Sequence, residues 1–170
     1  MTIGNRQPWP RFLAKAGLLM VITLAGGYWF IQNYRIGIDP QLEKCIPGYT
    51  FYLVDLNDKH IERGKIFAFR SRGVAPFFSD ETWMVKFVRG LPGDHIEIDA
   101  EHNVKVNNEV LSRGLFLSRE LQVDPAQFLG SATLKEREFW FMGLTDRSFD
   151  SRYWGVVHED QIIGRAYPLF

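Results

Sequence analysis

The sequence of 170 residues lacks the features that most often reveal a bound metal or nucleotide. Its single cysteine, Cys45, cannot form a disulfide within the chain and has no cysteine partner for a zinc site. The four histidines show no metal-ligand spacing, and no glycine-rich stretch ends in the Gly-Lys-Ser/Thr of a phosphate loop. We therefore expect neither a metal ion nor another cofactor.

An excess of charge of one sign is also missing. The chain has 20 basic and 20 acidic residues, and the basic ones are spread along its length. Nucleic-acid binding would then lack its main electrostatic driving force, so we expect no nucleic-acid partner. Repeats and low-complexity linkers are absent, and the length suits one domain with an accessory segment.

One long apolar run lies near the N-terminus. Residues 16–31 carry no charge, and with residues 12–14 and a snorkelling Lys15 they give about 20 residues, or roughly 30 Å of helix. Basic residues precede the run and acidic ones do not, which predicts a cytoplasmic N-terminus. We expect a cytoplasmic tail at 1–11, a transmembrane anchor in the inner membrane at 12–32, and an extracytoplasmic domain at 33–170.

Two other interpretations of the apolar run stay open. A cleaved signal peptide also has a basic start, and "TLAGG" supplies small residues for a cleavage site. A buried core helix fits the length and the basic flank less well. An anchor or a signal peptide would each export the rest of the chain into an oxidising compartment.

The residues after the run are patterned mainly as β-strands. The segments "TFYLVDL", "GKIFAFR", "TWMVKFVRGL", "HIEID", "NVKVN", "EREFWFMGL" and "IIGRAYPLF" are rich in branched and aromatic residues. Pro92-Gly93 and Asn107-Asn108 predict tight turns. Between residues 113 and 135 the pattern breaks, and Asp124-Pro125 predicts one short helix. The predicted fold is a mainly β domain with a small irregular or helical insertion.

A lysine interrupts the apolar pattern of "MVKFV". Met84 and Val88 share a face with Lys86, and the opposite face is also apolar, which indicates burial on both sides. A buried lysine without a partner loses its charge readily and can act as a general base. The pentapeptide by itself favours the alternative, an edge strand with Lys86 in solvent, because exposed lysines are common.

A second unusual segment is "TDRSFDSRYWGVV". Ser148, Asp150 and Arg152 alternate, so in an extended segment they would share one face. Asp150 and Arg152 could then hold a neighbouring group by hydrogen bonds and an ion pair. A polar surface turn is the other interpretation.

These segments resemble two boxes of the type I signal peptidase family, the serine-lysine membrane endopeptidases. "MVKFVRGLPGD" is similar to the lysine box, in which the base lysine stands four residues before Gly-Leu-Pro-Gly-Asp. "SFDSRYWGVV", followed by "IIGRA", resembles the C-terminal box. The resemblance covers roughly Leu42 to the C-terminus and implies a signal-peptidase-like β-domain in which Lys86 is the base.

The place of the nucleophile box is held by "KCIPGY". Cys45 stands at the serine position, with Pro47 two residues on, as in the family's conjugative pilin-processing branch. The resemblance implies Cys45 as nucleophile, with its backbone N–H as one oxyanion donor. It also implies that Ser148 and Asp150 orient Lys86 and that Arg152 fixes Asp150.

The same resemblance implies the partners of the chain. The substrate would be an exported precursor protein cut near the membrane lipid, or, as in the conjugative branch, a pilin precursor. If an amine rather than water resolved the acyl-enzyme, the pilin product would be cyclic.

The sequence departs from the family pattern at three places. Cysteine replaces serine, Glu43 stands where a hydroxyl side chain often lines the oxyanion hole, and Gly143-Leu144-Thr145 replaces Gly-Asp-Asn. A carboxylate at Glu43 would repel a developing oxyanion. These departures keep open a second hypothesis, a catalytically inactive relative that serves as a structural component of a secretion or conjugation apparatus. A soluble exported β-domain that binds a ligand is a third.

Overall fold

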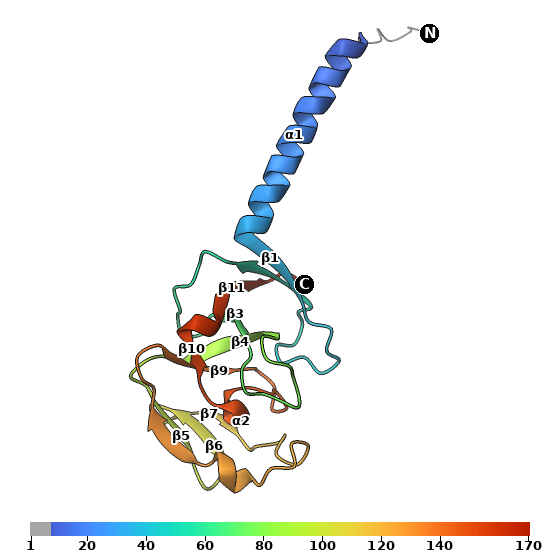
Figure 1. The fold of residues 1–170 in the computed structure, drawn as a ribbon. Coiled ribbons are helices and arrows are strands. Elements are labelled where there is room, and N and C mark those ends of the chain that lie inside the picture. The colour runs from blue at the N-terminus through green and yellow to red at the C-terminus, as the bar shows by residue number, and fades with distance from the viewer. Residues whose placement is uncertain (1–7) are drawn as a thin grey trace. The chain divides into compact units, whose positions relative to one another are not determined.

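The computed structural model describes residues 8–170, which divide between Tyr34 and Arg35 into two units. The first unit is the helix α1, Trp9–Asn33 (Figure 1). Its 25 residues would extend about 37 Å. By length and composition α1 is able to cross a membrane, and none of its residues is buried. The interpretation of this segment as a buried core helix is therefore wrong. Arg6 and most of the expected cytoplasmic tail lie outside the described residues.

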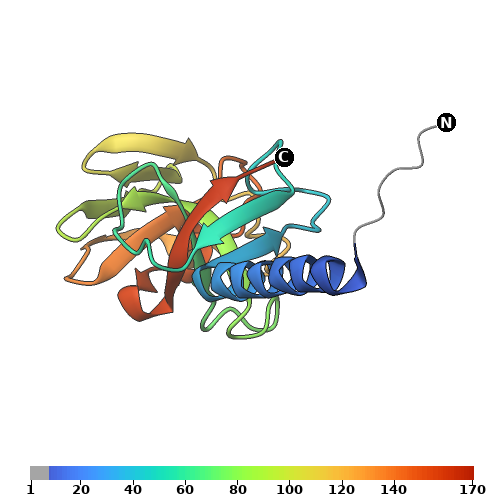
Figure 2. The ribbon, with the colours of Figure 1, turned by 90° about the horizontal axis from the view of Figure 1, so that it is seen from above.

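The second unit is mainly β, as predicted, and contains two antiparallel sheets. The larger sheet has the strand order β1-β2-β11-β3-β4-β9-β10, and the smaller has β7-β6-β5-β8. The strands are β1 Tyr34–Ile38, β2 Phe51–Asp55, β3 Ile66–Arg70, β4 Trp83–Gly90, β5 His95–Ile98, β6 Asn103–Val106, β7 Glu109–Arg113, β8 Gly130–Thr133, β9 Glu138–Met142, β10 Val157–His158 and β11 Ile162–Pro168. Figure 2 shows β2 and β11 side by side although they are far apart in the sequence.

Strand β9 connects the hydrophobic cores of the two sheets. Phe139 and Phe141 pack in one cluster with residues of β3 and β4, while Trp140 and Met142 pack in another with β5 and β6. Burial on both faces explains why "FWFM" is a continuous apolar run instead of an alternating one. The chain leaves this strand at Gly143, beside the site described below.

Strand β4 is interior to its sheet. It pairs with β3 on one side, where Phe67 is opposite Lys86, and with β9 on the other. Lys86 is only 6 % exposed and shares the buried face with Met84 and Val88. The edge-strand interpretation is therefore wrong, because pairing on both edges and packing against this face exclude solvent from the lysine.

The turns and the insertion follow the sequence in part. Asn107 and Asn108 both have positive φ, as a two-residue hairpin turn between β6 and β7 requires. Asp124 accepts a hydrogen bond from the Ala126 N–H and caps the short helix η1, Pro125–Phe128. The region 113–135 is not wholly irregular, however, because β8 pairs with β5. All four residues of β8 are exposed, so it carries no apolar alternation to reveal it.

Candidate active site

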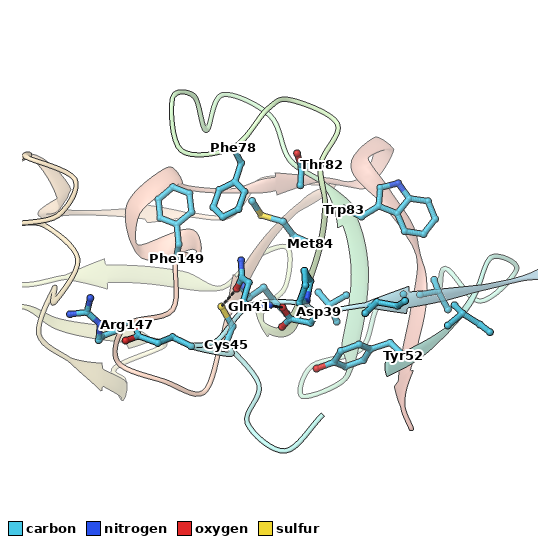
Figure 3. A pocket seen from close by; sticks show the side chains of 18 residues that line it. Asp39, Gln41, Cys45, Tyr52, Phe78, Thr82, Trp83, Met84, Arg147 and Phe149 are labelled. Carbon is cyan, nitrogen blue, oxygen red and sulfur yellow. Dashed lines mark hydrogen bonds and ion pairs between the residues drawn. The ribbon is translucent and has the colours of Figure 1, made fainter. Parts of the chain in front are cut away.

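A cleft of about 600 Å³ lies within the second unit, between the β1–β2 loop, β4 and the segment that precedes α2 (Ser151–Trp154). Figure 3 shows the side chains that line it. Cys45 and Lys86, which are far apart in the sequence, both line this cleft. The two sequence-predicted reactive side chains are thus brought to one place.

Cys45 sits on the β1–β2 loop and is 7 % exposed. The next residue, Ile46, is buried in a hydrophobic cluster with Tyr52 and Val54, which holds the loop against β2. The Cys45 carbonyl accepts a hydrogen bond of 2.8 Å from the Leu144 N–H. The loop is therefore fixed at Cys45 and just after it, by a backbone hydrogen bond and by apolar packing.

Lys86 reaches the cleft from the middle of β4. None of the ion pairs formed within residues 8–170 involves its amine. A buried ammonium group without a counter-charge is costly. The surroundings therefore favour chemistry in which Lys86 accepts a proton and an anion forms nearby.

Asp150 and Arg152 form a buried bidentate ion pair. The Arg152 Nε donates to Asp150 Oδ1 and its Nη2 to Oδ2, each at 2.8 Å. Asp150 Oδ2 also accepts a hydrogen bond of 2.9 Å from the Gly143 N–H. Burial alone would lower the pKa of Arg152, but its hydrogen bonds and attraction to Asp150 outweigh that effect and raise the pKa.

The guanidinium of Arg152 also holds the preceding loop. Its Nη2 donates to the carbonyl oxygens of Thr145 at 3.0 Å and Ser148 at 3.1 Å. These charge-assisted hydrogen bonds use the planar donor fork of arginine. Arg152 thus fixes the course of the segment that carries Ser148.

The predicted extended face is only partly correct. Asp150 has an extended backbone and caps α2 by accepting from the Arg152 N–H, so Arg152 itself lies in a helical turn. Its side chain returns to Asp150 instead of standing two strand positions beyond it. Ser148, Asp150 and Arg152 are all buried, and the interpretation as a polar surface turn is therefore wrong.

Ser148 Oγ is buried and has no hydrogen-bond partner in the part of the chain that the structure describes. It lies against Gly143, where an added Cβ would come 2.2 Å from Ser148 Oγ and 2.8 Å from the Cys45 carbonyl oxygen. The Ser148 hydroxyl, Gly143 and the loop that carries Cys45 are therefore in close contact.

Glu43 is paired with a cation. Its carboxylate accepts a 3.0 Å hydrogen bond from Arg147 Nε, and Arg147 Nη1 donates to Glu120 at 2.9 Å. These hydrogen bonds raise the pKa of Arg147. The Glu43 side chain is 75 % exposed, so solvent and Arg147 both moderate its charge. The repulsion between the Glu43 carboxylate and an oxyanion, which the sequence predicts, is reduced accordingly.

Two residues of the cleft were missed in the sequence. Tyr52 reads as an ordinary core aromatic in a strand, yet it lines the cleft. Its burial, followed by the nearby charges of Asp39, Cys45 and Tyr49, raises its pKa to about 12. Gln41 gives no signal at all, because an isolated glutamine in a loop is usually a solvated side chain.

The described residues contain no set of ligands for a metal ion. Within residues 8–170, no group of three or more His, Cys, Asp or Glu side chains is arranged to hold an ion.

Comparison with known proteins identifies the family. The family described as signal peptidase, peptidase S26 matches residues 11–170. A probable signal peptidase I-2 from Synechocystis sp. is 28% identical over 110 residues, which are 64% of this chain and 48% of that protein. This chain thus spans about half the length of that relative.

A solved structure is also similar. The crystal structure of a signal peptidase I from Enterococcus faecalis is 25% identical in sequence and aligns with a TM-score of 0.40. The alignment covers 64% of this chain and 97% of the other. Because the family match extends over nearly the whole sequence, the chain belongs to the signal peptidase, peptidase S26 family.

Proposed function

We propose that the chain is a membrane-anchored, signal-peptidase-like endopeptidase that cleaves exported precursor proteins, with Cys45 as nucleophile and Lys86 as general base. The observation that carries the proposal is that both side chains line one cleft although they come from different elements of the fold. Membership of the signal peptidase family supports peptide-bond cleavage as the reaction.

The reaction begins with transfer of the Cys45 thiol proton to the Lys86 amine. An ordinary thiol has a pKa of about 8.5, so it gives up a proton more easily than a serine hydroxyl. The resulting thiolate and ammonium attract each other, which offsets the cost of placing either charge alone in a buried site. The buried, unpaired state of Lys86 suits this exchange.

The thiolate then attacks the carbonyl carbon of the scissile peptide bond. The carbonyl electron pair moves onto oxygen, and the Cys45 backbone N–H donates a hydrogen bond to that oxyanion. When the C=O bond reforms, the C–N bond breaks and Lys86 gives its proton to the leaving amine. Water, activated by Lys86, hydrolyses the thioester and regenerates the thiol.

In this mechanism the polar groups of residues 148–152 orient the Cys45–Lys86 pair. In the proposal Ser148 Oγ accepts a hydrogen bond from the Lys86 amine, since this buried hydroxyl makes no hydrogen bond within residues 8–170. Asp150 and Arg152 hold Ser148 in position through the Gly143 N–H and the Ser148 carbonyl. Neither Asp150 nor Arg152 touches the substrate, so both are positioning residues.

The proposal extends to the membrane. Residues 12–32 would anchor the chain in lipid, with residues 1–11 in the cytoplasm and the catalytic domain, 33–170, on the extracytoplasmic side. The length and apolar composition of α1 support an anchor. A precursor emerging from the same membrane would reach the cleft as an extended segment along a strand edge.

A narrower substrate follows from the nucleophile loop. The spacing of Cys45 and Pro47 favours the conjugative branch, for which the substrate is a pilin precursor. An amine of the same pilin chain could then attack the thioester in place of water and close a ring. Mass spectrometry of the product distinguishes ring closure from hydrolysis, because the cyclic product is lighter than the hydrolysed one by the mass of one water.

A second candidate is an inactive family member that works as an assembly component. The exchange of serine for cysteine and the carboxylate of Glu43 favour it. The Glu43–Arg147 ion pair and the buried Lys86 favour the enzyme instead. Only the enzyme requires that Cys45 react with a precursor.

The test is processing of an exported precursor by the full-length chain in detergent or lipid. We expect Cys45→Ala and Lys86→Ala each to abolish cleavage, and Cys45→Ser to retain a part of it. Lys65→Ala is the matched control, because Lys65 is an exposed lysine outside the cleft. Full processing by Cys45→Ala would refute the proposal.

A further inference from the structure

A glutamine side chain lies beside the proposed nucleophile. The Cys45 thiol points to Gln41 Oε1 at 4.0 Å, and both residues line the cleft (Figure 3). Gln41 is exposed, whereas Cys45 is buried. A substrate carbonyl that approached the sulfur would therefore also meet this carboxamide.

The loop holds Gln41 in this place by short-range hydrogen bonds. The Gln41 N–H donates to Asp39 Oδ1 at 3.1 Å, and the Asp39 N–H donates to the Thr50 carbonyl at 2.8 Å. These contacts close the loop at its base, while the Leu144 N–H holds the carbonyl of Cys45. These contacts hold the Gln41 backbone in the loop, from which its side chain reaches the thiol.

The reaction proposed above needs a second oxyanion donor besides the Cys45 N–H. Glu43, at the position that the family often uses for this purpose, is an acceptor when ionised and is paired with Arg147. Gln41 is the neutral polar side chain in contact with the thiol, and a carboxamide carries two N–H donors as well as an acceptor. It can therefore supply the donor that Glu43 cannot.

We propose that Gln41 is a further catalytic residue, whose Nε2–H donates a hydrogen bond to the oxyanion formed when Cys45 attacks the scissile carbonyl. The inference rests on the proposed function. Before attack, Gln41 Oε1 accepts a hydrogen bond from the Cys45 thiol. Once the thiol proton has moved to Lys86, the sulfur is itself an acceptor, and a half-turn of the terminal amide torsion presents Nε2–H instead.

The change of Gln41 from hydrogen-bond acceptor to donor requires only a rotation of its terminal amide. The terminal torsion of glutamine has a broad, roughly two-fold profile, so the half-turn is accessible. The new C–S bond puts the oxyanion one carbon atom from the sulfur, next to the carboxamide. When the oxyanion collapses, the C–N bond breaks, the amine leaves with the proton from Lys86, and Gln41 is unchanged.

The experiment compares kcat and KM for full-length wild type, Gln41→Ala and Gln41→Glu. The probe is a fluorogenic peptide with an apolar segment before an Ala-x-Ala cleavage site. We expect Gln41→Ala to lower kcat about 100- to 1,000-fold with KM nearly unchanged, as for loss of one oxyanion donor. The Gln41→Glu side chain has nearly the same shape as glutamine but no N–H donor when ionised, so this variant should be no more active than Gln41→Ala.

A second readout separates oxyanion stabilisation from positioning of the thiol. Alkylation of Cys45 by iodoacetamide forms no oxyanion, so its rate at fixed pH should change far less than kcat in Gln41→Ala. Leu42→Ala is the control, since Leu42 is a fully exposed neighbour that does not line the cleft. An alkylation rate that falls together with kcat would overturn the oxyanion role.

The outcomes also separate this inference from the proposed function. If wild type cleaves the peptide, Cys45→Ala does not, and Gln41→Ala matches wild type, the role of Gln41 alone is refuted. If wild type fails to cleave, or Cys45→Ala cleaves as well as wild type, the proposed function fails and the role of Gln41 fails with it.

Discussion

Gly143→Ala tests how tightly the loop that carries Cys45 is packed against the C-terminal box. The added Cβ would lie 2.2 Å from Ser148 Oγ, 2.7 Å from Ser148 Cβ and 2.8 Å from the Cys45 carbonyl oxygen. Carbon–carbon contacts are optimal near 3.5–4.0 Å. Both neighbours are buried and the Cys45 contact is to backbone, so relief requires movement of the loop itself.

The expected magnitude follows from this crowding. Overpacking a well-filled interior costs about 1–3 kcal/mol of unfolding free energy. A displacement of about 1 Å at reacting groups can lower a rate about 100-fold. We therefore expect Gly143→Ala to lose stability moderately and to lose nearly all precursor cleavage, because the shift falls on Cys45.

The assay is urea unfolding of the full-length chain followed by tryptophan fluorescence, together with cleavage of the fluorogenic peptide. Gly37→Ala is the control for stability, since its Cβ would meet Tyr52 Cβ at an ordinary 3.8 Å. Wild-type stability and cleavage in Gly143→Ala would show that the two segments are not packed as described, and would refute the reasoning.

Three further predictions concern charged groups. Arg152→Ala leaves the buried Asp150 without its counter-charge and should cost about 3–5 kcal/mol in urea unfolding, with Arg152→Lys intermediate because the bidentate geometry is lost. Asp94 loses solvation on burial, but hydrogen bonds to its carboxylate outweigh this and lower its pKa. The stabilisation by the Asp94 carboxylate is full above the ordinary Asp pKa of about 3.9 and is lost as the pH falls through the lower pKa of the folded state. Below pH 4 the urea midpoint of Asp94→Asn should therefore depend less on pH than that of wild type. Arg147→Ala should slow peptide cleavage by leaving the Glu43 charge unopposed, and Glu43→Gln in the same chain should restore the rate; no restoration would contradict this electrostatic role.

The sequence predicted the strands whose side chains alternate between core and surface. β5 and β6 are clear examples, since Ile96, Ile98, Val104 and Val106 are buried while the residues between them are not. β8 was missed because it is an exposed strand that contributes backbone hydrogen bonds to β5 and no apolar face. Its existence depends on a partner that is distant in the sequence.

The candidate site likewise depends on contacts between residues that are distant in the sequence. The burial of Lys86 could not be decided from "MVKFV", because it depends on β3 and β9 pairing with both edges of β4. The family resemblance implies that Arg152 fixes Asp150, but the ion pair between them depends on a helical turn that the sequence does not predict. Gln41 could be found only from the structure, because its contact with Cys45 depends on the shape of the loop.

The proposed Cys45–Lys86 pair is tested most directly by the reactivity of the thiol at one fixed pH near 7. Full-length wild type, Lys86→Met and the control Lys65→Met are treated with iodoacetamide, and alkylated Cys45 is followed by mass spectrometry. Because the thiolate is the reactive species, removal of its base should slow alkylation severalfold in Lys86→Met and leave Lys65→Met at the wild-type rate. Equal rates in all three proteins would contradict the pair and leave Cys45 without its base.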